Sequence, residues 1–281
     1  YEQAINEYDK AIKLDPKYVW AYRNKGYALY KLGQYEEALA AVDNAIQIDP
    51  EYADSYNDRG NIYFELRKYE QAIPEYDKAI ELDPKYKWAY ANKGYALSKL
   101  GRYEEALATL NKAIEIDPEY ESVHEIKGEV FIRLGRHDEA VRELDKAIEI
   151  YNRLIREKPD EPSYYWNIGW CYYLENRYDD SIKASQKATS LDPKEPATQF
   201  NLGLVYLAMG KNKLSREAYQ EGIKKVNALP VGVAKYKYRD AIDELEKLIT
   251  RKPDIEIKAN QIIQLLCRAK EENLSRGQKE M

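Results

Sequence analysis

The stretch that decides the fold is residues 89–118, AYANKGYALSKLGRYEEALATLNKAIEIDP. Its apolar side chains recur at i, i+3, i+4 and i+7 on both sides of Gly101-Arg102-Tyr103. This spacing predicts two amphipathic helices joined by a tight turn. Pro118 ends the second helix, because proline cannot continue a helix and the residue before it avoids the helical region.

The same pattern recurs along the chain every 34 residues. Asp-Pro pairs end at Pro16, Pro50, Pro84 and Pro118. A glycine recurs in the middle of each first helix, at Gly26, Gly60, Gly94, Gly128, Gly169 and Gly203. Alanines recur in each second helix, at Ala38, Ala72, Ala106 and Ala140. Small residues at fixed places let two helix backbones approach closely, so each unit predicts a packed helix pair.

The period is interrupted once. The next proline is expected at position 152, which is Asn152; it comes at Pro159, and the period then resumes at Pro193. The insertion is close to two helical turns, so it keeps a helix in phase. The apolar stripe continues at Ala147, Tyr151, Leu154 and Ile155. We therefore expect this second helix to run on to about Lys158, either making contacts of its own or as a tolerated extension without a role.

On these residues the segment 89–118 resembles a tetratricopeptide repeat, with its aromatic, Gly, Tyr, Ala, Leu, Ala, Pro skeleton. The match covers a half-repeat at 1–18 and repeats at 19–52, 53–86, 87–120, 121–161 (with the lengthened second helix), 162–195 and 196–227. The resemblance implies an all-α fold, a right-handed superhelical α-solenoid of helix-turn-helix repeats. Its first helices would line a concave groove that usually holds a partner peptide.

Residues 228–281 depart from the repeat pattern. After the turn ALPVG at 228–232, apolar spacing predicts one amphipathic helix around 238–249 and a second around 255–269. We expect these helices to cap the solenoid, with a polar tail from Ser275.

The composition excludes several classes of function. The formal net charge is −5, which argues against a nucleic-acid-binding surface. The sequence contains no apolar run long enough for a membrane span, so no membrane association is expected. Cys171 and Cys267 do not make a disulfide framework, and a reduced, cytoplasmic setting is the expectation.

Residues for catalysis are scarce. The two histidines, His124 and His137, take repeat positions that tyrosines hold elsewhere, so packing or turn roles are expected. Cys171 falls in a small apolar position that predicts an inert, buried thiol. No Cys-x-x-Cys pair or phosphate-binding loop is present. We expect no catalytic residue, no metal ligand and no cofactor, and hence a protein that is not an enzyme.

The candidate binding residues are counted from each repeat glycine, at six, three and two positions before it and one and four after it. Two before gives Asn24, Asp58, Asn92, Ile126, Asn167 and Asn201. The resemblance implies that asparagines here pair with a peptide backbone, since a carboxamide has both a donor and an acceptor. The candidate peptide-binding residues are Trp20, Arg23, Asn24, Tyr27, Asn57, Asp58, Asn61, Trp88, Asn92, Tyr95, Trp166, Asn167, Trp170, Tyr173, Phe200 and Asn201.

Two features refine this expectation. In chaperone-tail binders of the family, a carboxylate clamp needs basic residues at these positions, and no three successive repeats of this chain supply them. The last two repeats instead predict an apolar wall, made by Trp166, Trp170, Tyr173, Leu174, Phe200, Leu204 and Leu207. A wall this apolar should be covered, either by a partner helix or, as we favour, by the chain's own segment 255–269.

The sequence thus predicts a non-catalytic protein–protein interaction scaffold that binds an extended peptide or an amphipathic helix of an unknown protein partner. One alternative is the substrate-recruiting arm of a larger enzyme. Another is a self-assembling array, because the chain opens on a second helix and an unpaired stripe of Ile5, Tyr8 and Ile12 would favour self-association through the N-terminal half-repeat.

Overall fold

The computed structural model describes residues 1–280, and the side chains of residues 1–276. In this described part, fifteen α-helices and one short 3-10 helix make up the secondary structure, without a strand. Contacts divide the chain into two compact units, residues 1–143 and 144–281. Each unit is described by itself.

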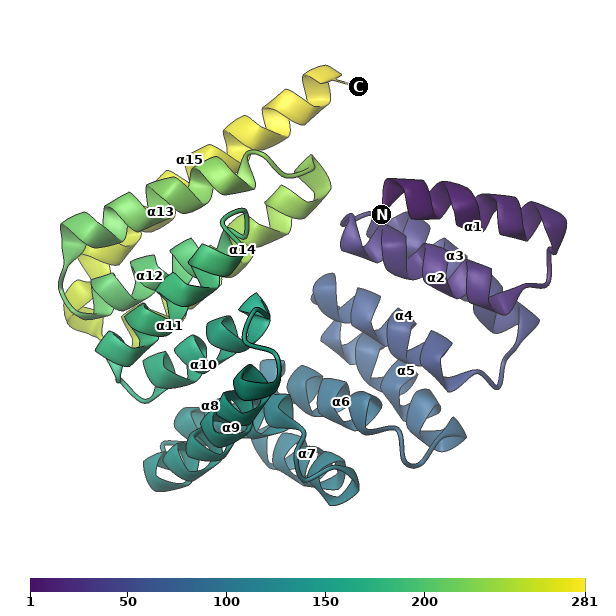
Figure 1. The fold of residues 1–281 in the computed structure, drawn as a ribbon, viewed down its shortest axis with the longest axis horizontal. Helices are drawn as coiled ribbons and strands as arrows, with labels where there is room; N and C mark the ends of the chain where they lie inside the picture. The colour runs from purple at the N-terminus through teal and green to yellow at the C-terminus, as the bar shows by residue number, and fades with distance from the viewer. Residues whose placement is uncertain (281) are drawn as a thin grey trace. The chain divides into compact units, whose positions relative to one another are not determined.

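Unit 1 is a run of helix pairs (Figure 1). Its helices are α1 (Glu2–Leu14), α2 (Val19–Lys31), α3 (Tyr35–Ile48), α4 (Ala53–Glu65), α5 (Tyr69–Leu82), α6 (Lys87–Lys99), α7 (Tyr103–Ile116), α8 (Glu121–Arg133) and the first part of α9 (His137–Glu157). Within the repeats α2 packs on α3, α4 on α5 and α6 on α7, and each pair packs on the next. The predicted all-α fold of consecutive helix pairs is confirmed. The stripe Ile5, Tyr8 and Ile12 is half-buried, and α1 packs on α2.

Unit 2 begins within α9 and continues the pairing. Its helices are α10 (Pro162–Leu174), α11 (Tyr178–Leu191), α12 (Ala197–Ala208), α13 (Asn212–Val226), α14 (Val231–Arg251), the 3-10 helix η1 (Pro253–Ile255) and α15 (Glu256–Glu280). Helix α14 starts earlier than the apolar spacing predicts, and α15 continues through Ser275. Helix α14 packs on α12 and α13, whereas α15 packs on α13 and α14.

Four of the repeat glycines, Gly26, Gly60, Gly94 and Gly203, lie so close to the second helix of their pair that an added Cβ would clash with it. A Cβ on Gly60 would lie 2.5 Å from Cε1 of Tyr76, and one on Gly94 would lie 2.6 Å from Cγ of Leu110. Contacts this short would force the neighbouring helix to shift. The structure therefore gives the physical reason for the recurring glycine.

The lengthened helix α9 has 21 residues, whereas α7 has 14. It ends at Glu157, one residue before the predicted Lys158. Tyr151, in the extension, is fully buried. Its ring centroid lies 6.4 Å from that of Tyr164 on α10. The extension is therefore packed within unit 2 and does not project freely into solvent.

Candidate peptide-binding face

The first helices of the repeats in unit 1, α2, α4, α6 and α8, contact one another in succession. We call the surface that they share the first-helix face. Three of its aromatic side chains are unusually exposed: Trp20 at 54%, Tyr27 at 46% and Trp88 at 50%. Large aromatic side chains of this kind are typical anchors for a binding partner.

A half-buried ionic cluster of Arg23, Asp54 and Asp58 joins α2 to α4 on this face. Arg23 Nε donates to Asp58 Oδ2 at 2.7 Å, and Arg23 Nη1 lies 3.4 Å from Asp54 Oδ2. The hydroxyl of Tyr86, which precedes α6, donates to Asp54. One guanidinium thus serves two carboxylates, and the three charged groups together carry one net negative charge.

The pKa values of Asp58 and Arg23 reflect both their burial and the presence of two carboxylates around one guanidinium. Burial, together with the neighbouring carboxylate of Asp54, raises the pKa of Asp58 to about 6 against the opposing effect of Arg23. For Arg23, burial lowers the pKa, but the two carboxylates outweigh burial and raise the pKa overall. Asp58 therefore takes up a proton at a higher pH than an ordinary aspartate does, mainly because it is shielded from water.

Next to the ionic cluster, three carboxamides converge from α4 and α6. Asn92 Nδ2 donates to Asn57 Oδ1 and to Asn61 Oδ1, each at 2.9 Å. The Tyr76 hydroxyl donates to Asn61 Oδ1 at 3.0 Å. These bonds use the oxygens of Asn57 and Asn61, so their N–H groups and the Asn92 oxygen are left for other partners. Asn57 is buried, while Asn61 and Asn92 are half-buried.

The remaining predicted residues of unit 1 also lie on its first helices. Asn24 is half-buried on α2. Tyr95 on α6 stacks on Phe64 at 4.9 Å between ring centroids. Lysine ammonium groups lie over two of the tyrosine rings, Lys31 over Tyr27 at 5.2 Å and Lys99 over Tyr95 at 4.3 Å.

In unit 2 the predicted residues of α10 are mostly covered. Trp166 and Trp170 stack with parallel rings, 6.4 Å between centroids and 3° between planes. Trp170 and Tyr173 are buried, while Trp166 and Asn167 are half-buried. The Arg251 guanidinium lies over the Tyr173 ring at 5.4 Å.

Phe200 and Asn201 on α12 point toward second helices. The Phe200 ring lies against Gly222, where a Cβ would come within 2.4 Å of it, and stacks on Tyr219 at 5.8 Å. Asn201 Nδ2 donates to Ser185 Oγ at 3.0 Å. Both residues are buried, so we leave them out of the site proposed below.

Helix α14 packs on α12, which carries Phe200, Leu204 and Leu207 of the predicted apolar wall. Lys252, just after α14, donates to the Ala208 carbonyl at 3.0 Å, and Lys237 pairs with Glu195 at 3.0 Å. The segment 255–269, favoured from the sequence as the cover, belongs to α15, which packs on α13 and α14. The helix that packs on α12 is thus α14, and not the segment 255–269 that the sequence analysis favoured.

Sequence reasoning missed Tyr52 and Tyr86. They precede α4 and α6, and Tyr86 bonds Asp54 while Arg23 lies over the Tyr52 ring at 5.7 Å. The signal was present, since tyrosine recurs two residues after the first four Asp-Pro pairs, at Tyr18, Tyr52, Tyr86 and Tyr120. The candidate binding positions were counted from six before to four after each repeat glycine, and this range did not include the loop residues Tyr52 and Tyr86.

His124 is buried, and both of its ring nitrogens have hydrogen-bond partners within the fold. Its Nδ1 lies 2.7 Å from Glu143 Oε2 and its Nε2 lies 3.1 Å from the Pro118 carbonyl oxygen. Tyr56, in the equivalent position, donates to the Pro50 carbonyl at 3.0 Å.

Over the described residues, no group of three or more His, Cys, Asp or Glu side chains is arranged to hold a metal ion. In that same part of the chain, no helix is both long enough and apolar enough to cross a membrane.

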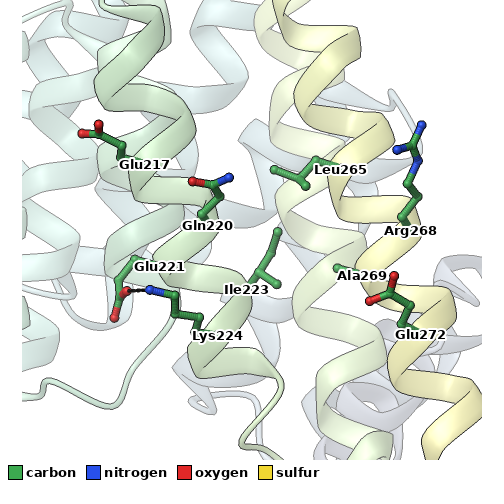
Figure 2. A pocket seen from close by; sticks show the side chains of 9 residues that line it. All are labelled: Glu217, Gln220, Glu221, Ile223, Lys224, Leu265, Arg268, Ala269 and Glu272. Atoms are coloured by element: carbon green, nitrogen blue, oxygen red, sulfur yellow. Dashed lines mark hydrogen bonds and ion pairs between the residues drawn. The ribbon is translucent and has the colours of Figure 1, made fainter.

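Unit 2 also carries an open hollow of about 810 Å³ between α13 and α15 (Figure 2). Charged side chains such as Glu217, Arg268 and Glu272 line its rim, and Ile223 and Leu265 lie between the helices. Glu221 and Lys224 pair with each other at 3.1 Å. Such a hollow, lined by flexible charged groups, is a weaker binding surface than the aromatic first-helix face.

Sequence profiles of the tetratricopeptide repeat family match nearly all of the repeat region. A profile described as TPR repeat matches residues 1–33, 26–66 and 60–101. Profiles described as tetratricopeptide repeat match residues 88–120, 121–194 and 196–224. The chain belongs to the tetratricopeptide repeat family, a class of helical repeat proteins. Membership of this family supports a role as a protein-interaction scaffold.

Solved structures share the fold. The Cut9–Hcn1 hetero-tetramer of APC/C matches 92% of this chain and 51% of its own, with 18% identity and a TM-score of 0.60. A thermophilic TPR protein of Thermus thermophilus, TTC0263, matches 64% of this chain and 94% of its own, with 23% identity and a TM-score of 0.54. At these identities the likeness concerns the fold alone. A comparison with curated protein sequences found no match.

Proposed function

We propose that the chain is a non-catalytic protein-interaction module that binds an extended peptide of a protein partner on the first-helix face of unit 1. The observation that carries the proposal is the convergence of Asn57, Asn61 and Asn92, with Asn92 Nδ2 bonded to both other side chains. The remaining N–H groups of Asn61 and the oxygen of Asn92, both on half-buried side chains, match the alternating C=O and N–H groups of an extended backbone, while buried Asn57 holds Asn92 in place.

The surroundings of this carboxamide cluster favour a peptide over a small molecule. Exposed Trp20 and Tyr27 lie on α2, and exposed Trp88 lies on α6, so aromatic anchors occur on helices either side of α4. A peptide that crosses these helices would place side chains on the rings while its backbone meets the amides. Hot-spot anchors combined with backbone hydrogen bonds are a common mode of peptide recognition.

The test is a selection of nonapeptides from a random display library against the full chain, followed by affinity measurements on single variants. Asn92→Ala should weaken the selected peptides about tenfold, since it removes the bonds that hold Asn57 and Asn61 in place and leaves the buried Asn57 oxygen without this donor. Asn111→Ala, an exposed position on the second helix α7, is the matched control and should leave affinity unchanged. Equal affinity for the wild-type chain and for Asn92→Ala would refute the proposed site.

A further inference from the structure

One lysine of unit 1 is held in a cage of aromatic rings and a carboxylate. Lys87 Nζ lies 5.1 Å from the centroid of the Trp88 ring and 5.2 Å from that of Tyr120. The same nitrogen lies 2.6 Å from Asp117 Oδ2. Cation–π attraction and ion pairing act together in this arrangement, so it is a favourable environment for an ammonium group.

The residues that form these cage walls recur at the equivalent positions two repeats earlier, without the lysine. Trp20, Tyr52 and Asp49 hold the positions of Trp88, Tyr120 and Asp117, whereas Val19 stands where Lys87 would be. We call these three residues the Trp20 cage. The ring centroids of Trp20 and Tyr52 lie 6.1 Å apart.

The backbones of the two cages agree closely. The dihedral angles are φ −133° and ψ 93° at Asp49, and φ −140° and ψ 97° at Asp117. Tyr52 has φ −84° and ψ 96°, and Tyr120 has φ −79° and ψ 92°. Asp49 Oδ1 accepts from the Glu51 amide at 3.0 Å, just as Asp117 Oδ1 accepts from the Glu119 amide at 3.0 Å. In the cage around Lys87, the other oxygen of Asp117, Oδ2, binds the Lys87 ammonium group.

The charges near the Trp20 cage favour an added cation. Arg23 lies over the Tyr52 ring, but its guanidinium is already engaged with Asp58 and Asp54. Together with Asp49, these groups carry three negative charges and one positive charge. A positively charged side chain is therefore attracted to the cage, while an acidic one is repelled.

We propose that Trp20, Tyr52 and Asp49 form a subsite for a lysine or arginine side chain of the peptide that binds on the first-helix face. This inference rests on the proposed function and adds the chemistry of the partner: a basic residue in the bound segment. The contacts of Lys87 with Trp88, Tyr120 and Asp117 are the pattern that we expect such a side chain to follow.

The direct test uses the indole ¹H–¹⁵N signals of the full chain, which has four tryptophans. Each signal is assigned by a Trp→Phe substitution. The probe is N-acetyl-lysine methylamide, with N-acetyl-norleucine methylamide as its neutral counterpart. The lysine probe should shift the Trp20 signal in a saturable way at millimolar concentrations, whereas the norleucine probe should not.

Two matched variants sharpen this test. Val19→Lys supplies the missing ammonium from α2 itself, so it should weaken the Trp20 response at least fivefold with an unchanged melting temperature. Lys87→Val removes the lysine from the cage of Trp88, Tyr120 and Asp117, so the Trp88 signal should then shift with the lysine probe. Equal Trp20 shifts with both probes, or an unchanged response in a folded Val19→Lys variant, would overturn the proposal.

Failure of the subsite can be told apart from failure of the proposed function. The amino-acid probes do not depend on Asn92, so the cage is tested by itself. If Asn92→Ala weakens a selected peptide but replacement of that peptide's basic residue by norleucine does not, the peptide-binding face stands and the subsite is wrong. If the probes behave as expected but Asn92→Ala has no effect, the proposed peptide site is wrong.

Discussion

Arg23 on α2 and Asp58 on α4 form an ion pair with an Nε–Oδ2 distance of 2.7 Å, and this pair connects two successive repeats on the first-helix face. Asp54 lies close to the same guanidinium, so the positive charge is divided between two carboxylates. The pair is thus a structural link, and the second carboxylate, Asp54, leaves one net negative charge on this part of the face.

The first prediction concerns pH. The pKa of Asp58 is raised to about 6 from its usual 3.8, so the folded chain holds this proton more tightly than the unfolded chain. The resulting stability is fully present below pH 3.8 and is lost as the pH rises through about 6. A shift of about two pKa units corresponds to at most about 3 kcal/mol. Urea unfolding of the wild-type chain and of Asp58→Asn at several pH values isolates this contribution. A difference between the two chains that stays constant from pH 4 to 7 would contradict it.

The second prediction concerns the glycine at the helix crossing. Gly60→Ala places a methyl group 2.5 Å from the buried Tyr76 ring, and the overpacking should cost about 1–3 kcal/mol. Gly169→Ala is the control, because its Cβ would meet Ser185 Oγ at 3.1 Å and alanine favours the helix by about 1 kcal/mol over glycine. Thermal and urea unfolding should show a clear loss for the first variant and little change for the second. Equal effects would mean that crossing distance does not set the choice of glycine.

The third prediction concerns the extension of α9. Tyr151 is fully buried and packs near Tyr164, so Tyr151→Ala should destabilise the chain by about 3–5 kcal/mol. The adjacent Asn152 is exposed, and Asn152→Ala should change the stability by less than about 0.5 kcal/mol. Denaturant unfolding of both variants distinguishes a packed extension from a tolerated one. If Tyr151→Ala is neutral, the extension has no stabilising role.

The fourth prediction concerns the end of a bound peptide. Peptides that end in Glu-Glu-Val-Asp should bind no more tightly with a free C-terminal carboxylate than with an amide. The reason is that Trp88 and Asn92 stand on α6 where a carboxylate clamp starting at Arg23 needs basic side chains. Calorimetry on the matched peptides measures this directly, and a clear preference for the free carboxylate would show that other basic groups on the chain replace the clamp.

Most of the fold could be predicted from the sequence, since the 34-residue period fixes where each helix pair begins and ends. The in-phase insertion also predicted the long α9 to within one residue. The start of α14 at Val231 was missed, because Gly232 is unfavourable in a helix and weakens the local signal. Tertiary packing of α14 on α12 and α13 overrides that local preference.

The candidate site was only partly predictable. Counting from the glycines placed Trp20, Tyr27 and Trp88 on the exposed face, because successive repeats share one geometry. The count could not show that Phe200 turns inward. Gly222 replaces the alanine of earlier repeats and leaves space that the Phe200 ring fills. Likewise Ser185 is small and polar, so it accepts the Asn201 side chain, whereas the bulkier Tyr76 holds the equivalent position in the second repeat.

Photo-crosslinking is the most direct test of whether a partner peptide binds on the first-helix face of unit 1. A selected peptide carrying one benzoylphenylalanine would be irradiated with the full chain, and the crosslinked residues would be mapped by mass spectrometry. Crosslinks are expected on α2, α4 and α6, near Trp20, Asn61 and Trp88, and a tenfold excess of unlabelled peptide should remove them. Competable crosslinks confined to the second helices α3, α5 and α7, or to unit 2, would contradict it.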